Sequence, residues 1–137
     1  MVGMPFCFVC FVGPESGLVS VKAACGEIAE TLPYMGSFIE DVIEGQYQPV
    51  HEVLDARATS AYSMDELVLF PPHLRYFAGT QIVHSGVAIG ALIVADGAIR
   101  DERISAERAS YLELCAKCIG EYLAATTATG LPTTGAL

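Results

Sequence analysis

Five cysteines are the residues whose types and spacing most readily suggest chemistry. Four of them form Cys-x-x-Cys pairs, Cys7 with Cys10 and Cys115 with Cys118, and the fifth is Cys25. Two such pairs could supply four thiolates to zinc or to an iron–sulfur cluster. The first pair falls in an expected strand, where side chains three residues apart point to opposite faces and cannot share one metal. We therefore expect packing thiols and no metal site.

A thiol nucleophile is the second chemistry to consider. Cys25 lies beside Gly26 at the end of an expected strand, where a reactive thiol could be exposed. Its base would be one of three histidines, His51, His73 or His84, whose spacing fits no metal site. The chain also contains no Gly-rich phosphate loop, Ser-His-Asp set or nucleophile elbow. We expect no catalytic residue, with a thiol-dependent enzyme using Cys25 as the alternative.

Aromatic and polar residues around an irregular segment, residues 56–73, are candidates to bind a small ligand. The candidates are Tyr62, Phe70, His73, Arg75 and Tyr76. Aromatic side chains with a few polar groups line small-molecule pockets, and they also build ordinary cores. Arg75 either meets a small anion or pairs with an acidic residue at position 55, 65 or 66. No motif indicates a cofactor.

The elements that must position these residues include two expected hairpins. Their strands cover residues 6–12 and 18–24, then residues 74–84 and 87–95. Ser85-Gly86 makes the second turn tight, and the nearly continuous apolar run after it predicts a strand buried on both faces. Gly90 within that run predicts a close approach of another element.

The remaining elements complete an α+β architecture. Apolar spacing predicts one or two helices over residues 27–44, a strand over 48–55 and a helical turn within 61–69. Ser105 is placed to cap a long final helix over residues 106–126, with Glu107 in its first turn. We expect one domain over residues 1–126, a central antiparallel sheet with helices on both faces, and a disordered tail over 127–137.

Composition restricts the partners. The 137 residues carry a formal net charge of −9 with only 7 Lys and Arg, which disfavours nucleic acid and anionic membrane surfaces. An odd number of cysteines argues against a secreted disulfide framework. The apolar N-terminus lacks the basic flank of a signal peptide, and no apolar run is long enough to span a bilayer. We expect a cytoplasmic protein.

Residues 75–96 carry a family resemblance. Arg75-Tyr76-Phe77-Ala78-Gly79, followed by the Gly turn and apolar strand of residues 86–96, resembles the closing signature of GAF domains. The match extends from about residue 75 to 123, although Thr80-Gln81 replaces an apolar residue and proline common in the family. The Asn-Lys…Phe…Asp-Glu arrangement of the cyclic-nucleotide-binding members is missing. A Per-Arnt-Sim-type domain is the nearest competing fold.

The resemblance implies a non-catalytic sensory or regulatory domain in signal transduction or transcription control. Such a domain binds a small molecule, dimerises, or does both, and its output would lie on a signalling partner or a longer parent chain. Two alternatives remain open. One is a small enzyme of the free methionine sulfoxide reductase type using Cys25, and the other is a purely structural dimerisation module.

The final helix predicts a homodimer. Leu112, Cys115, Ile119 and Tyr122 follow the i, i+3, i+7, i+10 spacing of a coiled-coil seam. A second apolar stripe, Tyr111, Leu114 and Cys118, runs beside it. One stripe is enough to cover the chain's own sheet, so two stripes need two partners. The alternative is that the helix sinks deeper into its own core.

Overall fold

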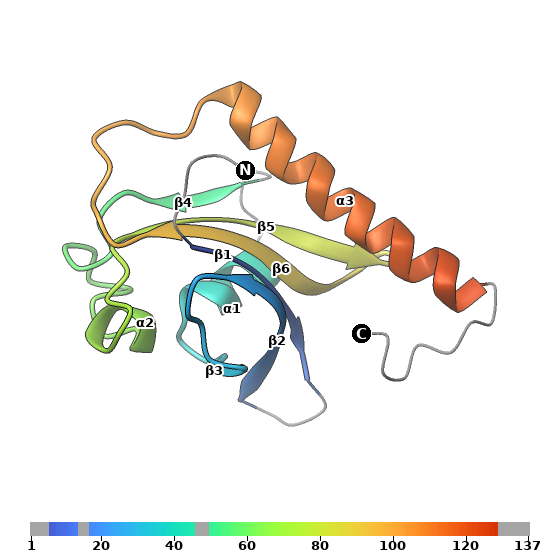
Figure 1. The fold of residues 1–137 in the computed structure, drawn as a ribbon, viewed down its shortest axis with the longest axis horizontal. Coiled ribbons are helices and arrows are strands. Elements are labelled where there is room, and N and C mark those ends of the chain that lie inside the picture. Colours follow the sequence, from blue (N-terminus) through green and yellow to red (C-terminus); the bar gives the residue numbers. More distant parts are fainter. Residues whose placement is uncertain (1–5, 14–16, 46–49, 129–137) are drawn as a thin grey trace.

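A six-stranded antiparallel sheet forms the centre of the computed structural model, which describes residues 6–13, 17–45 and 50–128 (Figure 1). The strands are β1 (Phe6–Val12), β2 (Leu18–Cys25), β3 (Thr31–Pro33), β4 (His51–Val53), β5 (Tyr76–His84) and β6 (Val87–Asp96). Their order across the sheet is β3-β2-β1-β6-β5-β4. The two expected hairpins, β1–β2 and β5–β6, are confirmed, and β1 joins them by pairing with β6.

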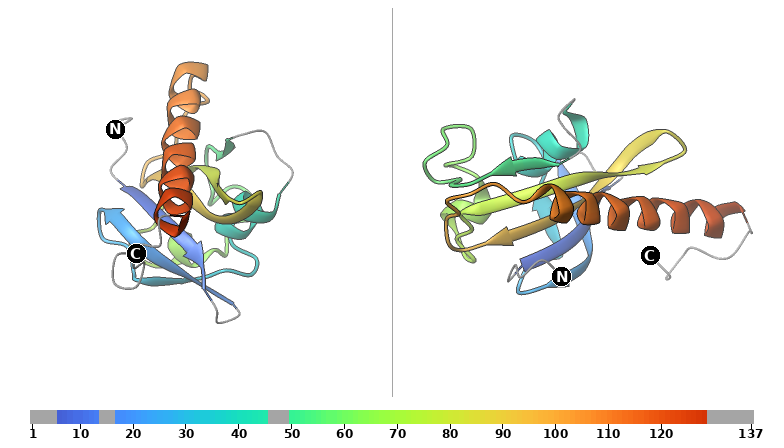
Figure 2. Two further views of the ribbon diagram at one scale, coloured as in Figure 1. Left: turned by 90° about the vertical axis from the view of Figure 1, so that its right-hand side faces the viewer. Right: turned by 90° about the horizontal axis from the view of Figure 1, so that it is seen from above.

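Helices cover both faces of this sheet. The long helix α3 (Ala106–Ala128) packs on β5 and β6 from one side. The short helix α1 (Phe38–Glu44) packs on the same two strands from the other side, where α2 (Glu66–Leu69) joins the same buried cluster. Figure 2 shows α3 lying over one face of the sheet. The predicted α+β architecture is therefore confirmed.

Strand β6 is buried on both faces, as its apolar run predicts. Ile93 belongs to the core on the α1 side, whereas Leu92 and Val94 belong to the core under α3. Gly90 allows β1 to come close, as predicted, because a Cβ there would lie 2.3 Å from the carbonyl oxygen of Cys10. Ser85-Gly86 takes positive φ at both positions, 52° and 79°, which is the type I′ geometry of a two-residue hairpin.

The expected helix over residues 27–44 is wrong in its first half. Thr31–Pro33 forms β3 and pairs with β2, and α1 begins only at Phe38. Pro33 disfavours helix in the residue before it, and Gly36 takes a φ of 75°, so the chain turns before helix can start. Ser37 then caps α1 by accepting a hydrogen bond from the Glu40 amide, with a nitrogen–oxygen distance of 3.2 Å.

Other boundaries also shift. The strand expected over residues 48–55 is reduced to β4, and residues 46–49 lie outside the described part of the chain. Ser105 caps α3 as expected, accepting from the Arg108 amide at 3.2 Å. The helix continues to Ala128, past the expected boundary at 126, and the rest of the expected tail lies outside the described residues. None of the described helices combines the length and apolarity needed to cross a membrane.

Candidate functional site

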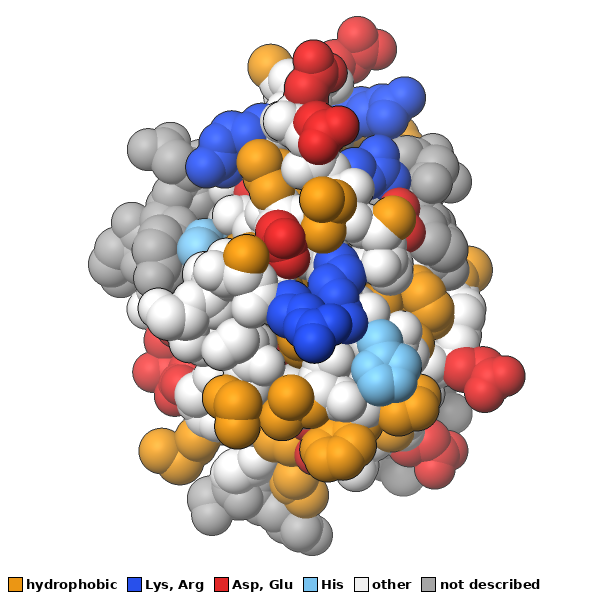
Figure 3. Space-filling view, turned by 90° about the vertical axis from the view of Figure 1, so that its left-hand side faces the viewer, with side chains coloured by type: hydrophobic (Ala, Val, Ile, Leu, Met, Phe, Trp, Pro, Cys, Tyr) orange, Lys and Arg blue, Asp and Glu red, His pale blue; other side chains and the backbone are white. Residues whose placement is uncertain are grey.

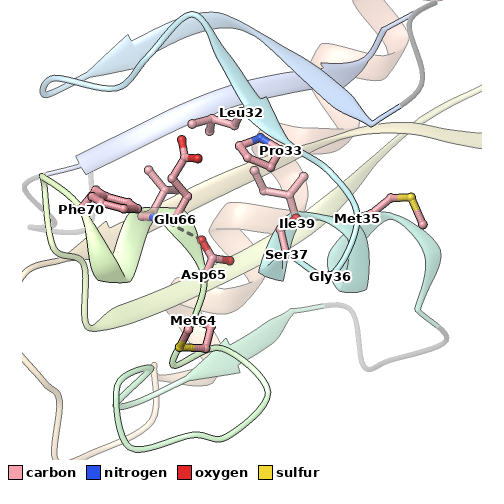
Figure 4. A pocket seen from close by; sticks show the side chains of 11 residues that line it. Leu32, Pro33, Met35, Gly36, Ser37, Ile39, Met64, Asp65, Glu66 and Phe70 are labelled. Atoms are coloured by element: carbon pink, nitrogen blue, oxygen red, sulfur yellow. Dashed lines mark hydrogen bonds between the residues drawn. The ribbon is translucent and has the colours of Figure 1, made fainter.

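A pocket of about 250 Å³ lies between the β3–α1 connection and α2 (Figure 4). Leu32, Ile39 and Leu67 form its buried apolar floor. Three large apolar side chains stand at its rim and are mostly exposed: Met35 (76%), Met64 (75%) and Phe70 (59%). Flexible thioethers and an aromatic ring around an apolar floor suit the binding of a small apolar molecule.

Asp65 fixes the geometry of this pocket. Its Oδ1 accepts from the Leu67 amide at 3.0 Å and caps α2. Its Oδ2 accepts from the amide of Phe38, also at 3.0 Å, at the start of α1. One carboxylate therefore ties together the N-termini of two short helices whose first amides need an acceptor.

The electrostatics of the pocket are acidic. Glu66 stands beside Asp65 with an exposed carboxylate, and Figure 4 shows its side chain directed toward Leu32. No lysine or arginine is among the described residues that line the pocket. The local field therefore disfavours a negatively charged ligand.

An aromatic cluster supports the site from below. The Phe38 ring stacks on His51 and Phe77, with centroid separations of 5.0 and 4.9 Å, and meets Tyr62 edge-on at 5.5 Å. The Tyr62 hydroxyl donates to a carboxylate oxygen of Asp41 and lies 3.0 Å from His51 Nε2. Burial lowers the pKa of His51, although nearby Asp41 acts in the opposite direction. Folding thus disfavours the protonated form of His51, whose ring lies inside a polar and aromatic network.

Three residues that the sequence predicts to bind a ligand, Tyr62, Phe70 and Tyr76, lie in different parts of the structure. Phe70 stands at the rim of the pocket, and Tyr62 lies in the aromatic cluster instead of the pocket wall. Tyr76 faces the opposite side of the sheet, in the core under α3. Its hydroxyl donates to a carboxylate oxygen of Glu52 at 2.5 Å, and the Arg100 guanidinium lies 5.3 Å from its ring centroid. Tyr62, Phe70 and Tyr76 therefore do not share one cavity.

The other two predicted residues, His73 and Arg75, lie at the exit from α2. His73 is exposed, with a positive φ of 57°. Arg75 Nη1 donates to the carbonyl oxygens of Val68, His73 and Leu74 at 3.0–3.3 Å. Among the described residues, no carboxylate pairs with Arg75, so the expected surface ion pair is wrong. Its guanidinium instead satisfies backbone carbonyls at the end of α2.

Sequence reasoning missed most of the pocket. Leu32 and Met35 come from a segment for which the apolar spacing predicts helix, and the sequence indicates Asp65 and Glu66 only as possible ion-pair partners for Arg75. The signal that could have found Asp65 is its position as an acidic N-cap just before a short apolar run.

A second cleft, of about 570 Å³, opens where α3 begins. Arg100, Arg103 and Arg108 line it; Arg100 pairs with Asp96 at 2.9 Å and Arg103 with Glu52 at 3.4 Å. Acidic residues lie in the same wall, and Figure 3 shows acidic and basic side chains interspersed toward the top of this end of the molecule. Asp101 and Glu102 in the lining, together with the partners Asp96 and Glu52, offset the positive charge of the three arginines, so the cleft does not present a concentrated positive charge.

None of the described residues that line the pocket between the β3–α1 connection and α2, which we call the α1–α2 pocket, is a cysteine. Cys25 is exposed on β2, directly opposite Cys7 on β1, and Cys10 is fully buried. Within the described residues, no group of three or more His, Cys, Asp or Glu is arranged to hold a metal ion.

Most of the predicted coiled-coil seam of α3 packs against the chain's own sheet. Leu112 is fully buried against the chain's own sheet, so its assignment to a dimer interface is wrong. Cys115 and Ile119 are partly buried against the same core, and Tyr122 is exposed. The stripe that stays exposed consists of Tyr111, Leu114, Cys118 and Tyr122. We call these four residues the outer stripe.

Comparison with known proteins identifies the fold. No family model and no curated protein sequence matches the chain. The GAF domain of a phosphoenolpyruvate-protein phosphotransferase from Coxiella burnetii superposes with a TM-score of 0.73, at 17% identity over 93% of this chain and 76% of that one. The GAF domain region of a putative membrane protein from Geobacter sulfurreducens gives 0.66, at 16% identity over 88% and 81%.

An enzyme shares the same architecture. The free methionine-R-sulfoxide reductase of Neisseria meningitidis, solved in complex with its substrate, gives a TM-score of 0.69, at 17% identity over 92% of this chain and 71% of that one. Identities this low establish the architecture, and the named GAF domains agree with the resemblance of residues 75–96. This chain has the GAF-domain fold.

Proposed function

We propose that this chain is a non-catalytic sensory or regulatory module whose input is a small molecule bound in the α1–α2 pocket. The observation that carries the proposal is the double cap by Asp65, which links both helices at the pocket wall. A ligand that moves α1 and α2 apart or together would change the two hydrogen bonds that the Asp65 carboxylate accepts. Ligand binding would then change the relative position of the two helices, and a sensor requires such a conformational change.

The proposed ligand is small, largely apolar, and neutral or cationic. The floor of Leu32, Ile39 and Leu67 would receive its apolar part, and the pocket volume limits its size. Glu66 would attract a positive group at the rim, since its carboxylate is exposed beside the opening. A carboxylate or phosphate ligand would meet repulsion there.

The thiol-enzyme alternative has less support. The similar Neisseria structure is a reductase, but none of the described residues lining the pocket of this chain is a cysteine. Cys25 lies on β2 beside Cys7, which places it with the first hairpin. We therefore propose that the chain catalyses nothing. The odd number of cysteines in the sequence supports our proposal of a reducing, cytoplasmic location.

We further propose that the outer stripe of α3 binds a second copy of the chain. Tyr111, Leu114 and Tyr122 are each about half exposed or more, at 50%, 56% and 55%, along one side of a 23-residue helix. An exposed apolar stripe of this kind is typical of a protein interface. A signalling output partner would then bind the pair of α3 helices in the dimer. The purely structural alternative is a dimer whose pocket stays empty.

Ligand binding is tested by native mass spectrometry of the purified protein, followed by identification of released molecules after denaturation. Thermal-shift screening then compares matched amines, alcohols and carboxylates of the same carbon skeleton. We expect stabilisation by the amine or the alcohol, and a smaller amine effect in Glu66→Gln. Glu121→Gln, an exposed change on α3, is the matched control. Stabilisation by the carboxylate alone would contradict the proposed ligand class.

Dimerisation is tested by analytical ultracentrifugation at micromolar concentration. We expect a dimer of the 14.5 kDa chain, and a monomer for Leu114→Glu, because a buried unpaired carboxylate opposes association. Ile99→Glu changes another exposed apolar residue outside α3 and should leave the dimer intact. A wild-type monomer would refute the interface.

A further inference from the structure

Two cysteines that are distant in sequence face each other across β1 and β2. Cys7 and Cys25 are direct partners in the antiparallel register. Such partners point to the same side of a sheet, with Cα atoms about 4.5–5.5 Å apart. Disulfides span Cα separations of about 4.4–6.8 Å, so the strand pairing places the Cα atoms of Cys7 and Cys25 at a separation that a disulfide can bridge.

The surroundings give the two thiols different roles. Cys25 is exposed, whereas Cys7 is half-buried and packs against the core under α3. Burial, together with the nearby thiols of Cys25 and Cys115, raises the pKa of Cys7. An oxidant in solution therefore reacts with Cys25 first. Cys7 is less accessible to the oxidant and remains a thiol that can react with the oxidised Cys25.

The local strand geometry allows the small movement that bond formation needs. Among the described strands, β3 pairs with β2 only at Leu18, Val19 and Ser20. The end of β2 that carries Cys25 is thus bonded to a strand on one side only, the side of β1. An edge segment can shift toward its neighbour without breaking a second ladder.

We infer that Cys7 and Cys25 form an oxidation site that closes reversibly to an intramolecular disulfide. Hydrogen peroxide converts the Cys25 thiol to a sulfenic acid and releases one water. The Cys7 sulfur then attacks the Cys25 sulfur, forming the S–S bond, and the sulfenic hydroxyl leaves with the Cys7 proton as a second water. Two thiols are oxidised, one peroxide is reduced, and a dithiol restores the pair. The proposal is independent of ligand binding in the α1–α2 pocket.

The test is peroxide titration of the reduced full chain, followed by denaturation and alkylation with N-ethylmaleimide. Because the chain has five cysteines, we expect the alkyl groups to fall from five to three, with the mass otherwise lower by two hydrogen atoms. Lys22 is the only tryptic site between the two residues, so the bond should join peptide 1–22 to peptide 23–57. Dithiothreitol should restore five alkylations.

Variants assign the bond. Cys25→Ser should abolish the linked peptides, whereas Cys115→Ser and Cys118→Ser should retain them. Cys10→Ala should also retain them, because Cys10 shares peptide 1–22 but is fully buried. Linkage of peptide 1–22 to peptide 109–117, which contains Cys115, would overturn the pairing. Oxidation that stops at a sulfenic or sulfinic acid on Cys25, or that joins two chains, would overturn the site.

Discussion

The two faces of the sheet are covered in different ways. One face is covered by α3, a single helix of 23 residues whose apolar positions recur at helical spacing. The other face, which we call the composite face, is covered by several short segments. Helix α1 has 7 residues, α2 has 4, and connecting segments cover the rest. A long helix satisfies nearly all its own backbone groups, whereas short helices leave most of theirs at the ends.

This difference explains where the candidate site lies. The short helices borrow acceptors from side chains, and Asp65 serves both α1 and α2 at the place where they meet. Short pieces meeting at an angle also leave room between them, and the pocket occupies that junction. Binding residues commonly collect on such irregular segments over a rigid scaffold. On the face covered by α3, the candidate binding feature is the exposed outer stripe of the helix.

The largest expected effect tests which residue organises the composite face. Phe38→Ala should lower the free energy of unfolding by about 3–5 kcal/mol, since Phe38 is almost fully buried among three aromatic rings. Leu112→Ala, on the α3 face, should cost about 2–5 kcal/mol. Urea denaturation followed by circular dichroism measures both. A loss below about 1 kcal/mol for Phe38→Ala would mean that this face collapses around other residues.

A smaller effect compares a shared cap with a single one. Asp65→Ala should lower the free energy of unfolding by about 2 kcal/mol, because both α1 and α2 lose an acceptor. Ser105→Ala removes the cap of α3 alone and should cost about 1 kcal/mol. Hydrogen exchange should show faster exchange in both short helices after Asp65→Ala. Equal costs for the two variants would show that one of the Asp65 contacts contributes nothing.

The smallest expected effect is a pH dependence confined to the composite face. Because folding lowers the pKa of His51, the unfolded chain binds its proton more tightly than the folded chain. The contribution of His51 to stability is therefore complete above its ordinary pKa of 6.5 and is lost as pH falls below that value. His51→Gln should flatten the decline in unfolding free energy between neutral and mildly acidic pH. His73→Gln, at an exposed histidine, is the control; an unchanged slope in His51→Gln contradicts the prediction.

Local sequence signals predicted the regular elements. The Ser85-Gly86 turn, the apolar run of β6 and the Ser105 cap each depend on neighbouring residues, and each appears where expected. The segment of residues 27–44 failed because its first half pairs with β2, a partner that helical spacing cannot reveal. The candidate site failed for a related reason, since alternation along β5 puts Tyr76 on the face opposite Phe77 but does not say which face holds the pocket.

The sequence by itself therefore determined the α+β class, the two hairpins and the final helix, because periodicity, turns and caps act over a few residues. Only the tertiary structure decided that the Asp65 carboxylate reaches the Phe38 amide 27 residues away, and that Leu112 faces inward while Leu114 stays exposed. It also placed Cys25 opposite Cys7. These contacts depend on strand order and on which side of a helix meets the sheet, and both are set by packing the whole chain.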